Sequence, residues 1–156
     1  MPGLTVRPLG FALGAEVTGV DLRIPLSPKD RGAIYEAWLK HLVLVYPGQD
    51  LEPEELIAFS RQFGELDRHD STPHYRDPAH PEILLVTNRM REGKPSETRN
   101  TGRNWHSDLT YTDRPAKGAL LLCKEKPPVG GDTMFANLYL AYETHSPKYR
   151  AFLEQL

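Results

Sequence analysis

Two residues near the middle of the chain combine types and spacing that suit metal chemistry. His106 and Asp108 are separated by a single residue, Ser107. In an extended strand the side chains of residues i and i+2 leave by the same face, so this imidazole and carboxylate would converge on one point. Imidazole and carboxylate are the ligand types of a 2-His-1-carboxylate centre, which holds Fe(II) and leaves coordination positions open. The pair therefore predicts two of the three ligands of such a centre.

The tripeptide by itself is weak evidence. With six His and nine Asp in 156 residues, a shuffled chain contains His-x-Asp roughly one time in three. A competing pattern, His80-Pro81-Glu82, occurs in the same sequence. It is the poorer candidate, because a proline disfavours regular pairing of a strand.

The elements expected before this pair follow from short local signals. Residues 4–9 and the glycine-rich stretch that ends at Asp21 predict strands. Ser27-Pro28 predicts a helix start, with Ser as the N-cap and Pro at the first helical position. The short apolar run 42–46 predicts a buried strand, and residues 53–63 predict a second helix that ends at Gly64.

The elements expected around and after the pair are less regular. Residues 89–104 are polar and lead directly into the pair, as either a plain connection or a lid over a site. The other expected elements are a loop over 65–81, strands over 82–87, 118–123 and 132–136, and helices over 139–142 and 146–156. Without further information this pattern indicates an α+β protein.

Composition excludes several classes of function. A net charge of −2 and a pI near 6.3 give no basic surface for nucleic acid or for an anionic membrane. The single cysteine excludes an internal disulfide, and no apolar run approaches the roughly 18 residues that would span a bilayer. The N-terminal residues lack a secretory pattern. We expect a cytoplasmic protein that acts on a small molecule, with no nucleic-acid or membrane partner; a homo-oligomer is left open.

Four blocks of sequence carry a family resemblance. They are Leu9–Leu22, Leu42–Gln49, Phe59–Gly64 and the stretch from Trp105 through Gly131-Asp132-Thr133 to Tyr142. In order and separation they resemble the taurine/α-ketoglutarate dioxygenase family, which includes the taurine, alkylsulfate and 2,4-dichlorophenoxyacetate dioxygenases. The resemblance implies a double-stranded β-helix (jelly roll, cupin-like) core with flanking helices, incomplete in this chain. Residues 1–156 would be the N-terminal portion of a single dioxygenase domain whose C-terminal portion is absent.

The resemblance also implies roles for individual residues and a set of cofactors. His106 and Asp108 match two iron ligands, and Thr133 matches a threonine that hydrogen-bonds a carboxylate of 2-oxoglutarate. Substrate contacts would come from His69, Thr72 and Leu109. The cofactors implied are Fe(II), 2-oxoglutarate as co-substrate, and O2. Thr72 stands where the taurine enzyme has a tyrosine, which predicts a substrate other than taurine.

Two hypotheses remain open, because the distal His and the 2-oxoglutarate-binding Arg of the family have no match here. His145 is the only histidine after Asp108, and neither Arg114 nor Arg150 matches the family's arginine. The first hypothesis is the N-terminal half of a dioxygenase that hydroxylates a small organic acid of the sulfonate, alkyl sulfate or aryloxyacetate type, with release of succinate and CO2. This chain alone would then be inactive. The second is a catalytically incomplete β-rich fragment that is structural or needs a second chain.

Overall fold

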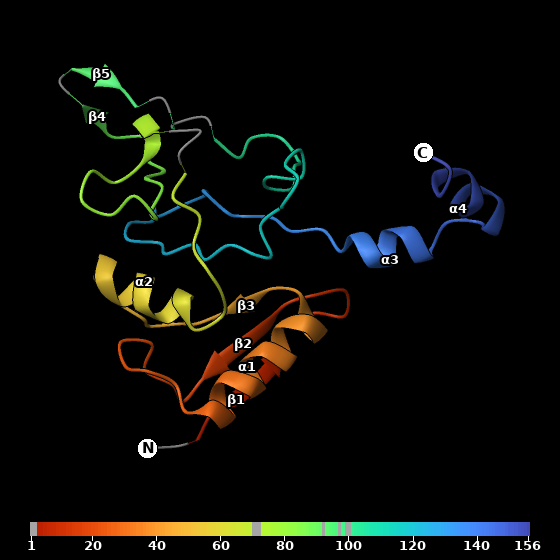
Figure 1. Cartoon of the computed structure of the whole chain (residues 1–156), viewed down its shortest axis with the longest axis horizontal. Helices are drawn as coiled ribbons and strands as arrows, with labels where there is room; N and C mark the ends of the chain where they lie inside the picture. The colour runs from red at the N-terminus through yellow and green to blue at the C-terminus, as the bar shows by residue number, and fades with distance from the viewer. Residues whose placement is uncertain (1–2, 70–72, 92, 97, 99–100) are drawn as a thin grey trace. The chain divides into compact units, whose positions relative to one another are not determined.

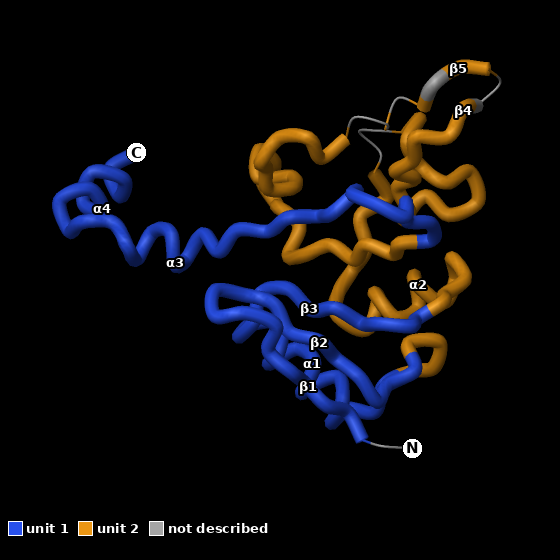
Figure 2. Tube along the Cα trace, turned by 180° about the vertical axis from the view of Figure 1, so that it is seen from behind, with its two compact units in different colours: residues 1–21, 26–49, 124–156 blue, residues 22–25, 50–123 orange. Residues whose placement is uncertain are grey.

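The computed structural model describes residues 3–69, 73–91, 93–96, 98 and 101–156 (Figure 1). The chain divides into two compact units, which are coloured separately in Figure 2. Unit 1 contains Met1–Asp21, Leu26–Gln49 and Lys124–Leu156, and unit 2 contains Leu22–Pro25 and Asp50–Cys123. His106 and Asp108 therefore belong to unit 2, whereas Thr133 belongs to unit 1.

Unit 1 is built on a three-stranded mixed sheet. Strand β1 (Thr5–Pro8) pairs antiparallel with β2 (Ala15–Thr18), and β2 pairs in parallel with β3 (Leu44–Val45). The register places Arg7 opposite Glu16, and their side chains form an ion pair of 3.1 Å. The strands predicted in the N-terminal part of the chain are confirmed, although β3 is shorter than the predicted 42–46.

The parallel strands are connected through α1 (Pro28–His41), which begins where the sequence predicted. The hydroxyl of Ser27 accepts the backbone N–H of Asp30 at 3.1 Å, and the same hydroxyl donates to the Asp30 carboxylate at 2.7 Å. The helix ends at Leu42, whose φ of 65° turns the chain sharply toward β3. A non-glycine residue in this conformation is strained, so the turn depends on the packing around it.

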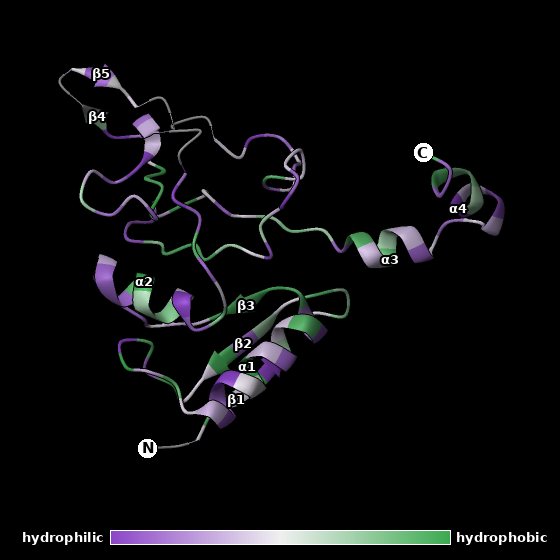
Figure 3. Ribbon diagram, in the orientation of Figure 1, coloured by the Kyte–Doolittle hydropathy of each residue, from purple (hydrophilic) through white to green (hydrophobic). Residues whose placement is uncertain are grey.

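The core of unit 1 lies between α1 and the sheet. Ala15 and Val17 of β2 and Ile34 and Ala37 of α1 are buried, and α1 packs against β2 and β3. In Figure 3, β3 is hydrophobic, whereas β2 and α1 each carry hydrophilic residues between apolar ones. The buried residues of α1 thus recur at helical spacing on the face that packs against the sheet.

Two short helices complete unit 1, and both have side-chain N-caps. Asn137 caps α3 (Leu138–Glu143) and Ser146 caps α4 (Pro147–Leu153). The Asn137 side chain also donates to the carbonyl of Ala12, which fixes the segment before α3 to the N-terminal part of the chain. Both helices were predicted within a few residues of their bounds.

Unit 2 has its own core around α2 (Pro53–Arg61). Leu22, Leu51, Ile57 and Phe59 are its buried apolar side chains. The helix ends are held by a capping box between Glu52 and Glu55 and by an ion pair of 3.0 Å from Arg61 to Glu82. The predicted helix 53–63 is confirmed, and it ends two residues earlier than expected.

The rest of unit 2 contains only short regular elements. They are a 3-10 helix η1 (Pro73–Tyr75) and a hairpin of β4 (Met90–Arg91) with antiparallel β5 (Lys94–Pro95). The hairpin lies inside the segment 89–104, which the sequence predicted to be irregular. That prediction was therefore wrong for the residues of β4 and β5.

Three strand predictions were also wrong. Segment 82–87 forms only an isolated bridge between Leu84 and Arg76, and segments 118–123 and 132–136 are irregular. An apolar run becomes a strand only when a neighbouring strand pairs with it, and the described residues supply none at these positions. For the same reason, the two small sheets of the described residues do not make the jelly roll that the resemblance implies. Within the described part of the chain, no helix has the length and apolar character needed to cross a membrane.

Thr98 is a buried polar residue that the sequence analysis did not identify. It is only 6% exposed, and its hydroxyl accepts the N–H of Thr87 at 3.0 Å and donates to the Thr87 carbonyl at 3.2 Å. A buried hydroxyl that pairs with both backbone groups of another residue fixes the two segments to each other.

We expect Thr98→Val to lower the free energy of unfolding by about 1–3 kcal/mol, because it leaves the two backbone groups of Thr87 unpaired. Urea denaturation followed by circular dichroism measures the difference. Thr110→Val is the matched control, since Thr110 is exposed and its loss of a hydroxyl should change stability by less than about 0.5 kcal/mol. Equal effects of the two substitutions would contradict the role of Thr98.

Candidate metal centre

The side chains of His106 and Asp108 meet in unit 2. The Nε2 atom of His106 lies 3.3 Å from Oδ1 of Asp108, and the two side chains are 53% and 62% exposed. This confirms that the two groups converge, as their spacing predicted. Their exposure leaves room for further ligands and for a substrate beside them.

The backbone that brings them together is not a strand. Residues 105–107 are irregular and residues 108–111 form a turn. The two side chains meet as predicted, but the prediction that they do so by leaving one face of a strand was wrong. They converge because the chain turns immediately after His106 and Ser107.

A backbone carbonyl determines which nitrogen of His106 is available. Nδ1 lies 2.8 Å from the carbonyl oxygen of Asn104. A carbonyl oxygen can only accept a hydrogen bond, so Nδ1 carries the proton. In the neutral ring Nε2 is then free of a proton and presents its lone pair, which is the form of histidine that binds a metal.

The arrangement fits a divalent metal ion. A bare lone pair on Nε2 facing the carboxylate of Asp108 is unfavourable unless a cation lies between them, either a proton or a metal. Imidazole nitrogen and carboxylate oxygen bind first-row metals at about 2.1 Å, so two such ligands of one ion lie at most about 4.2 Å apart. The observed 3.3 Å meets this condition. Among the described residues no cluster of three or more His, Cys, Asp or Glu side chains could hold a metal, so this site has two identified ligands.

Leu109, expected to contact substrate, directly follows the second ligand. It is half-buried and has a φ of 54°. Its carbonyl accepts both the N–H of Thr112 at 3.1 Å and the hydroxyl of Thr112 at 2.7 Å. Strained backbone at a non-glycine residue is found most often where it serves a site.

His69, another expected substrate contact, also has left-handed backbone, with φ of 52°. Its N–H donates to Oδ1 of Asp67 at 3.0 Å, and its Nδ1 lies 3.6 Å from Oδ2 of the same carboxylate. Asp67 therefore holds both the backbone and the ring of His69. Thr72, the third expected substrate contact, lies outside the described residues.

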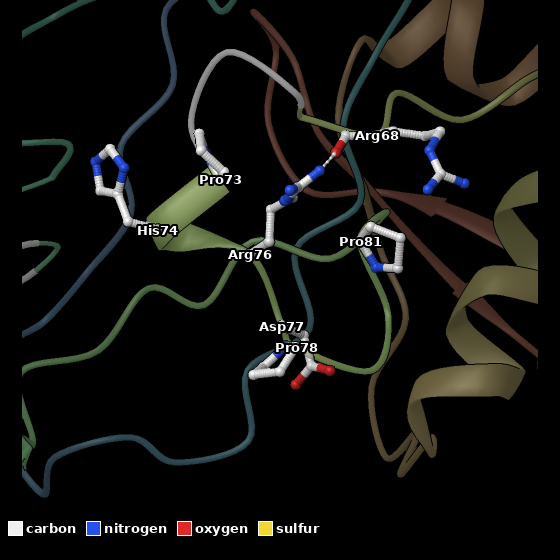
Figure 4. A pocket seen from close by; sticks show the side chains of 7 residues that line it. All are labelled: Arg68, Pro73, His74, Arg76, Asp77, Pro78 and Pro81. Atoms are coloured by element: carbon white, nitrogen blue, oxygen red, sulfur yellow. Dashed lines mark hydrogen bonds between the residues drawn. The ribbon is translucent and has the colours of Figure 1, made fainter.

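A pocket of about 330 Å³ is lined by Arg68 and by residues between Pro73 and Pro81 (Figure 4). Arg76 reaches across it and donates to the carbonyl of Arg68 at 3.2 Å. Asp77 accepts the backbone N–H groups of Ala79 and His80. Arg76 and Asp77 thus hold the loop's own backbone. His69 is not among the residues that line the pocket, which are Arg68, Pro73, His74, Arg76, Asp77, Pro78 and Pro81.

Thr133, the expected 2-oxoglutarate contact, lies in unit 1 on irregular, exposed backbone. It follows Gly130 and Gly131, whose φ angles of 75° and 76° make a turn that side chains disfavour. A Cβ at Gly131 would lie 3.0 Å from Cγ of Pro127, so any other residue would also require the proline ring to shift. After Thr133 the chain is fixed by Asn137, as described above.

Sequence reasoning missed three residues that shape these sites: Asn104, Thr112 and Asn137. Asn104 acts through its backbone carbonyl, which leaves no signature in residue type. Thr112 could have been noticed as a threonine three residues after Leu109, the spacing of a side-chain-to-backbone hydrogen bond. Asn137 could have been identified as an N-cap, because asparagine is among the preferred residues before a helix.

Comparison with known proteins identifies relatives over nearly the whole chain. The family model described as "Taurine catabolism dioxygenase TauD, TfdA family" matches residues 5–156. The (S)-phenoxypropionate/alpha-ketoglutarate-dioxygenase of Delftia acidovorans is 32% identical over an alignment 163 residues long, gaps included, and the alignment covers 97% of this chain and 52% of that protein.

Solved structures of dioxygenases also match this chain over nearly its whole length. A putative alpha-ketoglutarate-dependent taurine dioxygenase from Burkholderia xenovorans superposes with a TM-score of 0.74 at 34% identity, over 96% of this chain and 50% of that one. AAD-2, solved in complex with Mn(II) and N-oxalylglycine, gives a TM-score of 0.77 at 29% identity, over 98% of this chain and 54% of that one. The chain thus spans about half the length of the proteins it matches.

Proposed function

The chain belongs to the taurine catabolism dioxygenase TauD, TfdA family, and from this premise we propose that it forms part of an Fe(II)- and 2-oxoglutarate-dependent dioxygenase that hydroxylates a small organic acid. The observation that carries the proposal is the 3.3 Å approach of His106 Nε2 to Asp108 Oδ1. The Asn104 carbonyl supports it, because it orients the ring so that Nε2 faces the carboxylate. The named dependence of the Delftia relative on α-ketoglutarate supports the choice of co-substrate.

Bound Fe(II) would supply the oxygen chemistry, in which O2, 2-oxoglutarate and a substrate C–H group give succinate, CO2 and the C–OH product. His106 and Asp108 hold the metal with one neutral and one anionic ligand. Two ligands do not complete the protein's share of such a centre. We propose that the third ligand comes from polypeptide beyond these 156 residues, since the matched relatives are about twice as long as the stretch they share with this chain.

Thr133 is proposed to donate its hydroxyl to a carboxylate of 2-oxoglutarate. A hydroxyl orients a carboxylate but does not neutralise its charge, so a cationic side chain, preferably an arginine for its planar fork, must pair with it as well. Arg114 and Arg150 do not match the family's arginine, and we place that residue with the third metal ligand, outside this sequence.

We propose an acidic organic molecule as the primary substrate. Two of the relatives reported above are named as a phenoxypropionate dioxygenase and a putative taurine dioxygenase, and these two compounds carry a carboxylate and a sulfonate. His69, Thr72 and Leu109 are the proposed contacts. With Asp67 beside Nδ1, the imidazole of His69 leaves Nε2 for a polar group of the substrate, and half-buried Leu109 offers apolar surface for the carbon skeleton.

The test uses the whole protein with Fe(II), 2-oxoglutarate and three substrate panels: alkylsulfonates, alkyl sulfates and aryloxyacetates. We expect release of succinate that depends on both Fe(II) and one panel, with formation of the hydroxylated product or its breakdown products. Succinate release without dependence on Fe(II), or none with any panel, would contradict the proposal.

Replacement of Thr133 by alanine should raise the 2-oxoglutarate concentration needed for half-maximal turnover. One hydrogen bond to a charged group contributes about 1.5–3 kcal/mol, which corresponds to roughly a 10- to 150-fold increase. Thr133→Ser, which keeps the hydroxyl, should retain most of the wild-type value. If Thr133→Ala changed only the affinity for the organic substrate, the proposed contact between Thr133 and 2-oxoglutarate would be contradicted.

A further inference from the structure

The turn that follows Asp108 is closed by Thr112 in two ways. The carbonyl of Leu109 accepts the N–H of Thr112 at 3.1 Å and its hydroxyl at 2.7 Å. The turn begins in left-handed backbone at Leu109, where φ is 54°. A leucine in this conformation costs roughly 1–2 kcal/mol, so other interactions must hold it there.

The side chain of Asp108 has little else to hold it. It is 62% exposed, and within the described part of the chain the contact recorded for its carboxylate is the one with His106. The position of the carboxylate therefore depends on the backbone at Asp108, and that backbone enters directly into the strained residue. If Leu109 relaxed to negative φ, the direction of the chain on either side of it would change. The 3.3 Å distance between the Asp108 carboxylate and His106 would then change as well.

From these contacts we infer that Thr112 is a positioning residue for the metal centre: its hydroxyl holds Leu109 in left-handed backbone and thereby keeps Asp108 beside His106. The inference rests on the proposed function, because it assumes that this pair binds a metal. Thr112 itself acts only through the backbone of Leu109. Residues that support metal ligands in this indirect way typically change metal affinity by 10- to 100-fold when they are replaced.

The test measures Mn(II) binding to the whole protein by electron paramagnetic resonance, at a temperature where every variant is folded by circular dichroism. Thr112→Val keeps the shape of the side chain and removes the hydroxyl, and we expect it to raise the dissociation constant for Mn(II) at least about tenfold. Thr112→Ser, which keeps the hydroxyl, should stay within about threefold of wild type. Thr112→Ala gives the same comparison if valine prevents folding.

A second threonine supplies a matched control. In unit 1 the hydroxyl of Thr144 donates to the carbonyl of Ala141 at 2.9 Å, again three residues back along the chain. Thr144→Val therefore removes a hydrogen bond of the same kind at a place that carries no proposed ligand. We expect it to leave Mn(II) affinity unchanged within about twofold. An equal loss of affinity in the two valine variants would overturn the positioning role, because the effect would then be one of general stability.

The Mn(II) measurements test metal binding by His106 and Asp108 separately from the positioning role of Thr112. If the wild-type protein binds Mn(II), His106→Ala does not, and Thr112→Val binds as wild type does, then the metal centre stands and the role of Thr112 is overturned. If the wild-type protein binds no Mn(II), both are overturned.

Discussion

Replacement of His106 by alanine should abolish Fe(II)-dependent consumption of 2-oxoglutarate in the whole protein. The substitution removes the only nitrogen ligand identified in the described residues, the Nε2 atom that lies 3.3 Å from Asp108. Loss of a residue that merely supports a metal ligand costs 10- to 100-fold, so loss of the ligand should cost more than about 100-fold. Succinate release at saturating 2-oxoglutarate measures the effect.

Loss of turnover must be separated from loss of the fold. His106 is half exposed, and its recorded contacts are with Asp108 and the Asn104 carbonyl, so the alanine variant should keep the wild-type far-ultraviolet circular dichroism. Asp108→Asn keeps the size of the side chain and removes its charge, and it should likewise prevent metal binding. His145→Ala, which removes an exposed imidazole from unit 1, should leave turnover unchanged. Retention of more than a tenth of the wild-type rate in His106→Ala would refute the ligand assignment.

The helices could be predicted because their signals are local. Ser27 and Pro28 fix the start of α1 through contacts within one turn, and the capping box of Glu52 and Glu55 does so for α2. Strands are different, since their pairing depends on residues far away in sequence. The runs 118–123 and 132–136 have strand-like composition but no paired neighbour among the described residues, and composition alone cannot supply one.

The candidate site was predicted in part, and for an incomplete reason. The spacing of His106 and Asp108 correctly predicted that their side chains meet, but the expected strand is absent and a turn brings them together. Backbone conformation of this kind is hard to read from residue types, because left-handed φ at Leu109 runs against the preference of leucine. Such a conformation exists only because the surrounding contacts maintain it.

Unit 2, which carries the candidate metal centre, depends on a small core, and Phe59 is its largest fully buried side chain. The ring is 1% exposed and packs edge-to-face against Phe63, with ring centroids 5.4 Å apart. We expect Phe59→Ala to lower the free energy of unfolding by about 3–5 kcal/mol, through lost burial and the cavity left behind. Domains are typically stable by only 5–15 kcal/mol, so this single change removes a large part of the total.

The chain offers the same substitution at an exposed site. Phe11 is 99% exposed, so Phe11→Ala should change the free energy of unfolding by less than about 0.5 kcal/mol. Urea denaturation monitored by circular dichroism compares the two variants. Because Phe59 and His106 belong to the same unit, Phe59→Ala should also weaken Mn(II) binding as temperature rises, before wild type does. Equal stability of the two alanine variants would show that the buried cluster around α2 does not hold this unit together.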